Sequence, residues 1–185
     1  MTRTPAIALV VLLAGGCTQM APHYNPSVEN IQKLRDSGAG SARVATLEPK
    51  LVAGQRNDSI QLRASSMESP YGGRFTTYLE EALKAELSAA RLFDDKSSVE
   101  IGGVVTRNDV SVANLSEGYG EIEARVTVKR AGGVRFDKMK FTRITFESGF
   151  LGAVAIPNGR NAYPNLVQKF FADLFADPEF IAALK

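Results

Sequence analysis

The chain has 185 residues, of which 44% are hydrophobic and 23% charged, a composition typical of one folded domain with short appendages. Lysine and arginine number 22 against 20 acidic residues, and this near balance argues against a nucleic-acid-binding protein. A single cysteine, Cys17, excludes an intramolecular disulfide. With a single histidine, His23, the chain has few side chains that could form a zinc site or a cysteine–histidine catalytic pair. We therefore expect no metal, no cofactor and no nucleic-acid partner.

The first 16 residues have the layout of a secretory signal. Arg3 supplies the only charge, residues 6–13 are an unbroken apolar run, and residues 14–16 are small. A membrane-spanning helix needs about 20 apolar residues, so this run is too short to be the preferred candidate for one. We expect residues 1–16 to be a signal peptide that is removed.

Cys17 stands at the expected cleavage point. The sequence LAGGC that ends at Cys17 resembles the bacterial lipobox, although Ala14 stands where Leu is more common. In a lipobox the thiol accepts a diacylglycerol, and after cleavage the new N-terminus is acylated, so that several acyl chains form a lasting anchor. The alternative is an incidental cysteine in an ordinary signal. By resemblance to enterobacterial lipoproteins, Thr18 favours the periplasmic leaflet of the outer membrane, whereas Asp there would favour the inner membrane.

Beyond the signal we expect a lipidated N-terminus and flexible tether over residues 17–41, and a single α+β periplasmic domain over residues 42–185. The tether is rich in Pro, Asn, Ser and Gly and has no sustained apolar period except around residues 31–34. Alternation in residues 43–47 and 59–64 predicts two strands, which we expect to pair with each other.

The period then changes from that of a strand to that of a helix. Phe75, Leu79, Leu83 and Leu87 recur every four residues, while charged residues fill the other faces. This spacing predicts an amphipathic helix.

Three strands are expected next, over residues 99–112, 122–129 and 134–147. The middle strand alternates between apolar and polar or charged residues, and a tight turn at residues 131–133 joins it to the last strand. The apolar residues of the last strand change parity, and a bulge near residues 137–138 would reconcile them.

A closing helix follows a glycine-containing stretch at residues 149–159. The apolar stripe over residues 166–175 predicts this helix, and the Asp-Pro pair at residues 177–178 predicts a final turn. The expected order is β-β-α-β-β-β-α, a single antiparallel or mixed sheet with two helices packed on one face.

The succession YLEEALKAELSAARLF, VEIGGVVTRNDVSVAN, EIEARVTVKRAGG and LVQKFFADLFADPEFIAALK resembles the YajG family of bacterial lipoproteins. In that family a helix, a strand, a long hairpin and a C-terminal helix follow a lipobox, and the resemblance runs from about Arg56 to the end. It implies a fold, an envelope location and a lipid on Cys17, but no biochemical activity. Related α+β lipoproteins act as accessory subunits in lipid or lipopolysaccharide transport, an analogy at the level of the fold alone.

Seven basic residues crowd the predicted hairpin and form a candidate face for an anionic partner: Arg125, Lys129, Arg130, Arg135, Lys138, Lys140 and Arg143. Such a face suits anionic lipid headgroups, lipopolysaccharide phosphates or an acidic protein. The simpler interpretation is that these side chains solvate the outer face of the sheet and protect an edge strand.

We do not expect an enzyme. Asp94, Asp95, Asp109, Asp173 and Asp177 supply carboxylates, but none comes with a histidine, a nucleophile motif or metal-ligand spacing. The phenylalanines of the closing helix are more simply explained as core than as the wall of a ligand cavity.

Two functions are consistent with the sequence. The preferred one is a non-enzymatic structural or protein-interaction module, anchored through Cys17 and contacting other envelope proteins or anionic lipids. The other is a lipid- or lipopolysaccharide-handling accessory subunit of an envelope transport system, which holds an apolar ligand between sheet and helices. An open apolar groove beside Phe170 and Phe171 would favour the second, and a filled core the first.

Overall fold

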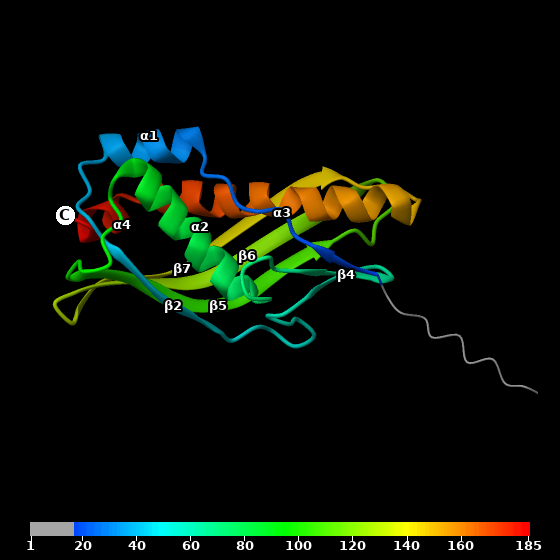
Figure 1. Ribbon diagram of the computed structural model, residues 1–185, viewed down its shortest axis with the longest axis horizontal. Helices are drawn as coiled ribbons and strands as arrows, with labels where there is room; N and C mark the ends of the chain where they lie inside the picture. Colours follow the sequence, from blue (N-terminus) through cyan, green and yellow to red (C-terminus); the bar gives the residue numbers. More distant parts are fainter. Residues whose placement is uncertain (1–16) are drawn as a thin grey trace, which may run out of the picture.

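Two β-sheets and four helices make up residues 17–185, the part of the chain that the computed structural model describes (Figure 1). The elements are β1 (Thr18–Met20), α1 (Val28–Asp36), β2 (Arg43–Pro49), β3 (Ile60–Leu62), β4 (Ser65–Glu68), α2 (Phe75–Ala90), β5 (Val99–Ser111), β6 (Glu117–Arg130), β7 (Gly133–Glu147), α3 (Gly152–Phe175) and α4 (Pro178–Ala183). The α+β class is as expected, but the single sheet with two helices is wrong. The predicted signal peptide lies outside the described residues.

The larger sheet has the strand order β2-β5-β6-β7. β5, β6 and β7 are antiparallel neighbours, and the predicted tight turn is present, with positive φ at Ala131 (47°) and Gly132 (81°). Two successive residues with positive φ are the signature of a turn whose twist matches that of the strands it joins. β2 runs parallel to β5, and α2 lies in the crossover between them.

The smaller sheet has the order β1-β4-β3. β3 and β4 form a short antiparallel hairpin, and β1 adds to β4 in parallel. The expected pairing of residues 43–47 with residues 59–64 is therefore wrong, because β2 pairs with β5 and β3 pairs with β4. Strands of three or four residues are too short for their hydrophobic pattern to show which strand they pair with, because pairing is made by backbone hydrogen bonds.

The flexible tether expected over residues 17–41 is also wrong, because this segment is folded onto the domain. It contains β1 and α1, and Ala21, Tyr24 and Leu34 are buried in the core. The side chain of Ser27 caps α1 by accepting a hydrogen bond from the Asn30 N–H.

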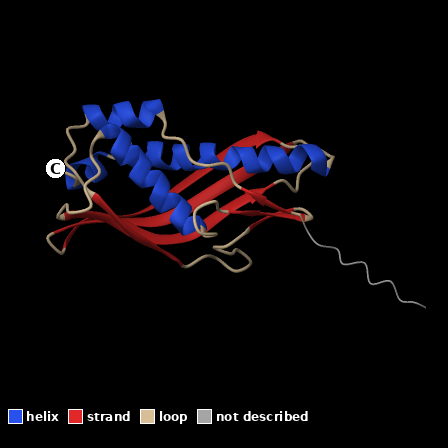
Figure 2. Cartoon of the chain, viewed as in Figure 1, coloured by secondary structure: helices blue, strands red, loops and turns tan. Residues whose placement is uncertain are grey.

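All four helices lie on one side of the larger sheet (Figure 2). α2 buries Phe75, Leu79, Leu83 and Leu87 as its period predicted, and α1 forms a further layer that contacts α2 and α3. The closing helix begins earlier than expected, because residues 152–159 belong to α3. A Cβ added at Gly159 would lie 2.6 Å from the Val112 side chain, so a glycine is needed for this close approach of α3 to β5.

The last strand, β7, is irregular near its start and not at residues 137–138. The register with β6 shifts between Val128 and Lys129, which face Phe136 and Val134, so the extra residue is Arg135. Met139 and Phe141 consequently stay on the face away from the helices, where each is about half exposed. Within residues 17–185, no helix is long and apolar enough to cross a membrane.

Candidate functional site

Cys17 is the first residue that the structure describes and lies directly before β1. It is an exposed, free cysteine. Its carbonyl oxygen accepts a hydrogen bond from the Ser66 N–H of β4 (3.2 Å), and the hydroxyls of Thr18 and Ser66 are also 3.2 Å apart. The sulfur therefore faces solvent from a backbone that the smaller sheet holds in place.

The chain after β1 is held by Glu86, a fully buried carboxylate on α2. Its Oε1 accepts hydrogen bonds from the Tyr24 hydroxyl (2.5 Å), the Ser27 N–H (3.0 Å) and the Asn30 side-chain amide (3.1 Å). Burial raises the pKa of the Tyr24 phenol, and the hydrogen bond to Glu86 raises it further. Periodicity within residues 17–41 gives no sign of this contact, because its acceptor lies 56–62 residues away along the chain.

A second missed residue, Arg63, joins three segments at the end of the molecule that carries Cys17. Arg63 adopts a positive φ of 55° in the β3–β4 turn. Its guanidinium donates to the carbonyl oxygens of Val112 (2.9 Å), Gly149 (2.7 Å) and Phe150 (2.9 Å). We call this end, comprising Cys17, β1, the β3–β4 turn and the β7–α3 connection, the anchor end.

The seven basic residues of the predicted anionic-partner face do not share a face. Lys138 pairs in register with the buried Val126, so Lys138 and Lys140 lie on the side that the helices cover. Arg125 and Arg143 lie on the opposite side. Because side chains alternate along a strand, one face could not have carried both groups.

Lys138 and Lys140 are bound to α4. Lys138 lies 2.7 Å from Glu179, and Lys140 lies 3.2 Å from Asp177, which also accepts from the Glu179 N–H at the start of α4. Burial alone would raise the pKa of Asp177, but the Glu179 N–H and the Lys140 ammonium lower it overall. These two lysines therefore serve to hold α4 against β7.

Arg125 and Arg143 also have carboxylate partners. Arg125 makes a two-pronged contact with Asp137 (2.6 and 2.7 Å). Arg143 lies 2.6 Å from Glu121 and 4.0 Å from the centre of the Tyr119 ring. Four of the seven cations are thus neutralised within the fold.

The other three, Lys129, Arg130 and Arg135, lie at the β6–β7 turn, which we call the hairpin end. Among the described residues, none of them has a carboxylate within 4 Å. Arg130 and Arg135 line a shallow cleft of about 460 Å³ beside Glu179. The part of the predicted basic face that is free to meet a partner is therefore small and lies at one end of the sheet.

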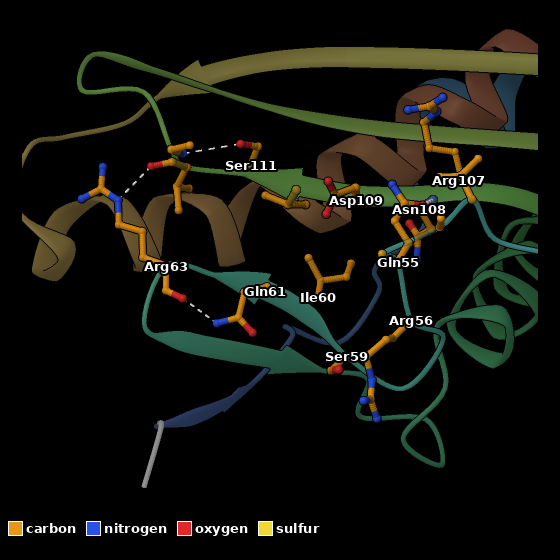
Figure 3. A pocket seen from close by; sticks show the side chains of 16 residues that line it. Gln55, Arg56, Ser59, Ile60, Gln61, Arg63, Arg107, Asn108, Asp109 and Ser111 are labelled. Carbon is orange, nitrogen blue, oxygen red and sulfur yellow. Dashed lines mark hydrogen bonds between the residues drawn. The ribbon is translucent and has the colours of Figure 1, made fainter. Parts of the chain in front are cut away.

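A polar cleft of about 670 Å³ lies between β5 and the chain that leads into β3 (Figure 3). Asp109 and Ser111 of β5 lie opposite Ile60 and Gln61 across it. Burial raises the pKa of Asp109, a feature that active-site acids often share. No hydrogen bond joins its carboxylate to a nucleophilic side chain within the described part of the chain. The lining combines apolar side chains with hydrogen-bonding groups such as Gln55, Gln61 and Ser111.

The interface between the larger sheet and its helices is filled. The residual cavity there has about 20 Å³, room for about one water molecule, and Phe170 and Phe171 in its wall are each 3% exposed. Small-molecule sites measure about 300–1,000 Å³. Among residues 17–185, no group of three or more His, Cys, Asp or Glu side chains is placed to hold a metal ion.

Comparison with known proteins identifies a fold and no family. No family model and no curated protein matches the sequence. A Xanthomonas campestris protein of the family DUF330 has a similar structure, with a TM-score of 0.55 and 12% identity over 85% of this chain and 94% of that one. A Caulobacter crescentus CB15 protein described as a candidate lipoprotein has a TM-score of 0.44 and 11% identity, over 82% of this chain and 93% of that one. An uncharacterised protein has a TM-score of 0.42 and 9% identity, over 85% of this chain and 92% of that one. The first likeness shows a shared fold, and membership of the YajG family stays a prediction.

Proposed function

We propose that this protein is a bacterial envelope lipoprotein, held through diacylglycerol and N-acyl chains on Cys17 and acting as a non-enzymatic structural or protein-interaction module. The observation that carries the proposal is the placement of Cys17. It follows a signal-like apolar run, it is exposed, and its backbone is hydrogen-bonded to β4 of the domain. A lipid attached there meets no part of the domain that would have to move.

The outer membrane is the proposed location, with the domain in the periplasm. The support is Thr18, which takes the place of the Asp that retains enterobacterial lipoproteins in the inner membrane. Thr18 is not committed to the core, since it is exposed and its hydroxyl lies 3.2 Å from that of Ser66. Its identity is therefore free to serve sorting.

An interaction module is favoured over a lipid carrier because the core is full. The carrier needs an apolar space between sheet and helices, and the cavity beside Phe170 and Phe171 holds about one water molecule. Two open surfaces suit protein contacts instead: the polar cleft beside β5 and the cations of the hairpin end.

The anchoring is tested by Cys17→Ser in cells that are fed labelled palmitate. We expect the wild-type chain to take up label and sediment with outer membranes, and the variant to lose both properties. Thr18→Ser is the matched control, because it retains the hydroxyl and should leave labelling unchanged. Label on the Cys17→Ser variant, or its firm retention in membranes, would refute lipidation at this residue.

The interaction role is tested by crosslinking in intact cells. A photo-reactive residue at Gln61 in the cleft should form adducts with envelope proteins. The same residue at Gln32, on the exposed side of α1, is the control. Recovery of phospholipid in place of protein at Gln61 would favour the lipid-handling alternative.

A further inference from the structure

Four large apolar side chains are exposed together at the anchor end. Leu115 (62% exposed) lies in the β5–β6 loop, and Phe150 (75%), Leu151 (63%) and Val154 (47%) lie where β7 passes into α3. A hydrogen bond from the Ser148 N–H to the Ser116 carbonyl brings the two loops together. We call these four residues the apolar tip. Burying such side chains is favourable, so a cluster of them left in water points to a binding surface.

The apolar tip and Cys17 lie at the same end of the molecule. Arg63 donates to the carbonyl oxygens of Gly149 and Phe150, and Ser66, three residues further along, donates to that of Cys17. Three residues span at most about 11 Å of extended chain. Figure 1 shows the blue start of β1 and the gold start of α3 at one end of the long axis.

There is no slack between Cys17 and the folded domain. β1 begins at the next residue, and Tyr24 and Ser27 are held by the buried Glu86. A lipid on Cys17 therefore brings the anchor end itself to the bilayer, where a long tether would have left the domain free to turn.

We propose that the apolar tip enters the headgroup–acyl boundary of the bilayer that holds the Cys17 lipid, and that the domain stands on the membrane by this end. The inference deepens the proposed function and rests on the lipidation of Cys17. Apolar side chains of a lipid-anchored protein gain from burial about 5–10 Å into this boundary.

The charges near the tip show which force holds it there. Glu117 and Glu147 are exposed, face each other across β6 and β7, and lie beside the two loops of the tip. The Arg63 guanidinium, bound to the carbonyl oxygens of Gly149 and Phe150, offsets one of them, so no excess of positive charge draws the tip to anionic headgroups and the contact depends on apolar burial. Tip insertion should therefore be the same in zwitterionic and anionic vesicles and insensitive to salt.

The experiment uses the lipidated full chain, reconstituted in vesicles of phosphatidylcholine with or without phosphatidylglycerol. Because the lipid occupies the Cys17 sulfur, Leu151→Cys carries a polarity-sensitive fluorophore at one site only, and Arg130→Cys at the hairpin end is the matched control. We expect blue-shifted emission at position 151 and quenching by acrylamide, a neutral water-soluble quencher, about threefold weaker than at position 130. Equal quenching at both positions overturns the inference.

A second variant guards against a local effect of the label. With the fluorophore on Leu115→Cys, the pair Phe150→Glu and Leu151→Glu should abolish protection from acrylamide, whose neutrality makes it insensitive to the added charges, and the fold should persist because both side chains are exposed. Continued protection at position 115 in this variant contradicts insertion of the tip.

Three outcomes separate the causes of failure. Absence of palmitate on the purified chain removes the anchoring and this inference with it. Palmitate together with equal quenching removes the inference alone. Protection in native membranes but not in protein-free vesicles means that a protein covers the tip, which also overturns the lipid contact.

Discussion

The two ends of β7 meet different chemistry. At the Glu147 end the chain passes directly into Phe150 and Leu151, whereas the Gly133 end is flanked by Arg130 and Arg135. A 15-residue strand separates these ends by about 45 Å. One element thus carries apolar contact at one end and free positive charge at the other, which gives the domain a polarity along its strand direction.

This polarity has consequences only because the N-terminal segment is folded. If residues 18–36 were a loose tether, either end could face the membrane, and the position of Cys17 would say nothing about orientation. The segment is held by β1–β4 pairing and by the buried carboxylate of Glu86. The orientation of the two ends therefore depends on the β1–β4 pairing at the anchor end and on the hydrogen bonds to Glu86.

The strongest way to break the contrast is Glu86→Ala. The change leaves the Tyr24 hydroxyl, the Ser27 N–H and the Asn30 amide without their shared acceptor in a buried place. We expect a loss of about 3 kcal/mol in the free energy of unfolding, measured by urea denaturation, and new protease cleavage within residues 18–41.

The control for this change is Glu81→Ala on the same helix. Glu81 is partly exposed and pairs only with Lys84, so its loss should cost less than about 0.5 kcal/mol and expose no cleavage site. Equal effects of the two changes would mean that Glu86 does not hold the segment.

A milder change, Tyr24→Phe, tests the same contact with Glu86, because its effect on the free energy of unfolding should depend on pH. Near neutral pH it removes one hydrogen bond to a carboxylate, and we expect a cost of about 1.5 kcal/mol. The pKa of Tyr24 is raised above its ordinary value of 10.0 in the folded state, so the unfolded chain loses this proton first. Wild-type stability from this group is therefore complete below pH 10 and declines above it.

The variant has no phenol to titrate at this position. The difference in unfolding free energy between the wild type and Tyr24→Phe should close by about 1.4 kcal/mol by pH 11, as measured by urea denaturation across pH 8–11. Tyr163→Phe is a useful comparison, because its phenol is also buried with a raised pKa but contacts Asn108 of β5. A constant difference across this range would show that Tyr24 ionises equally easily in both states.

The same contrast shows which parts of the fold were predictable. α2 and the β6–β7 hairpin have one buried and one exposed side, so burial imposes a period that the sequence displays. β1 is three residues long and paired through its backbone, and α1 has a buried polar residue, Asn30, that reads as surface. The hydrophobic periodicity of a short segment does not show which distant residues that segment contacts.

For the candidate site, the sequence can separate some of the basic residues that were predicted to share a face. Lys138 and Lys140 have even numbers in a stretch whose outward residues, such as Asp137 and Arg143, are odd, so alternation alone separates the two lysines from Arg143. The polar cleft was not predictable in this way. Its walls are β5 and an irregular stretch near Gln55, and only the tertiary structure brings them together.

The smallest expected effects concern the basic residues, and they compare the hairpin end with the cations that hold α4. Replacing Lys138 and Lys140 by Gln should lower the free energy of unfolding, because the contacts with Asp177 and Glu179 are lost. It should leave binding of a soluble acidic probe, polyglutamate, unchanged. Replacing Arg130 and Arg135 by Gln should do the opposite: stability within about 0.5 kcal/mol of wild type, and weaker, less salt-dependent binding of polyglutamate. If both double substitutions weakened polyglutamate binding equally, the lysines on the covered side would have to reach the same ligand as the arginines at the turn. The free positive charge would then not be confined to the hairpin end.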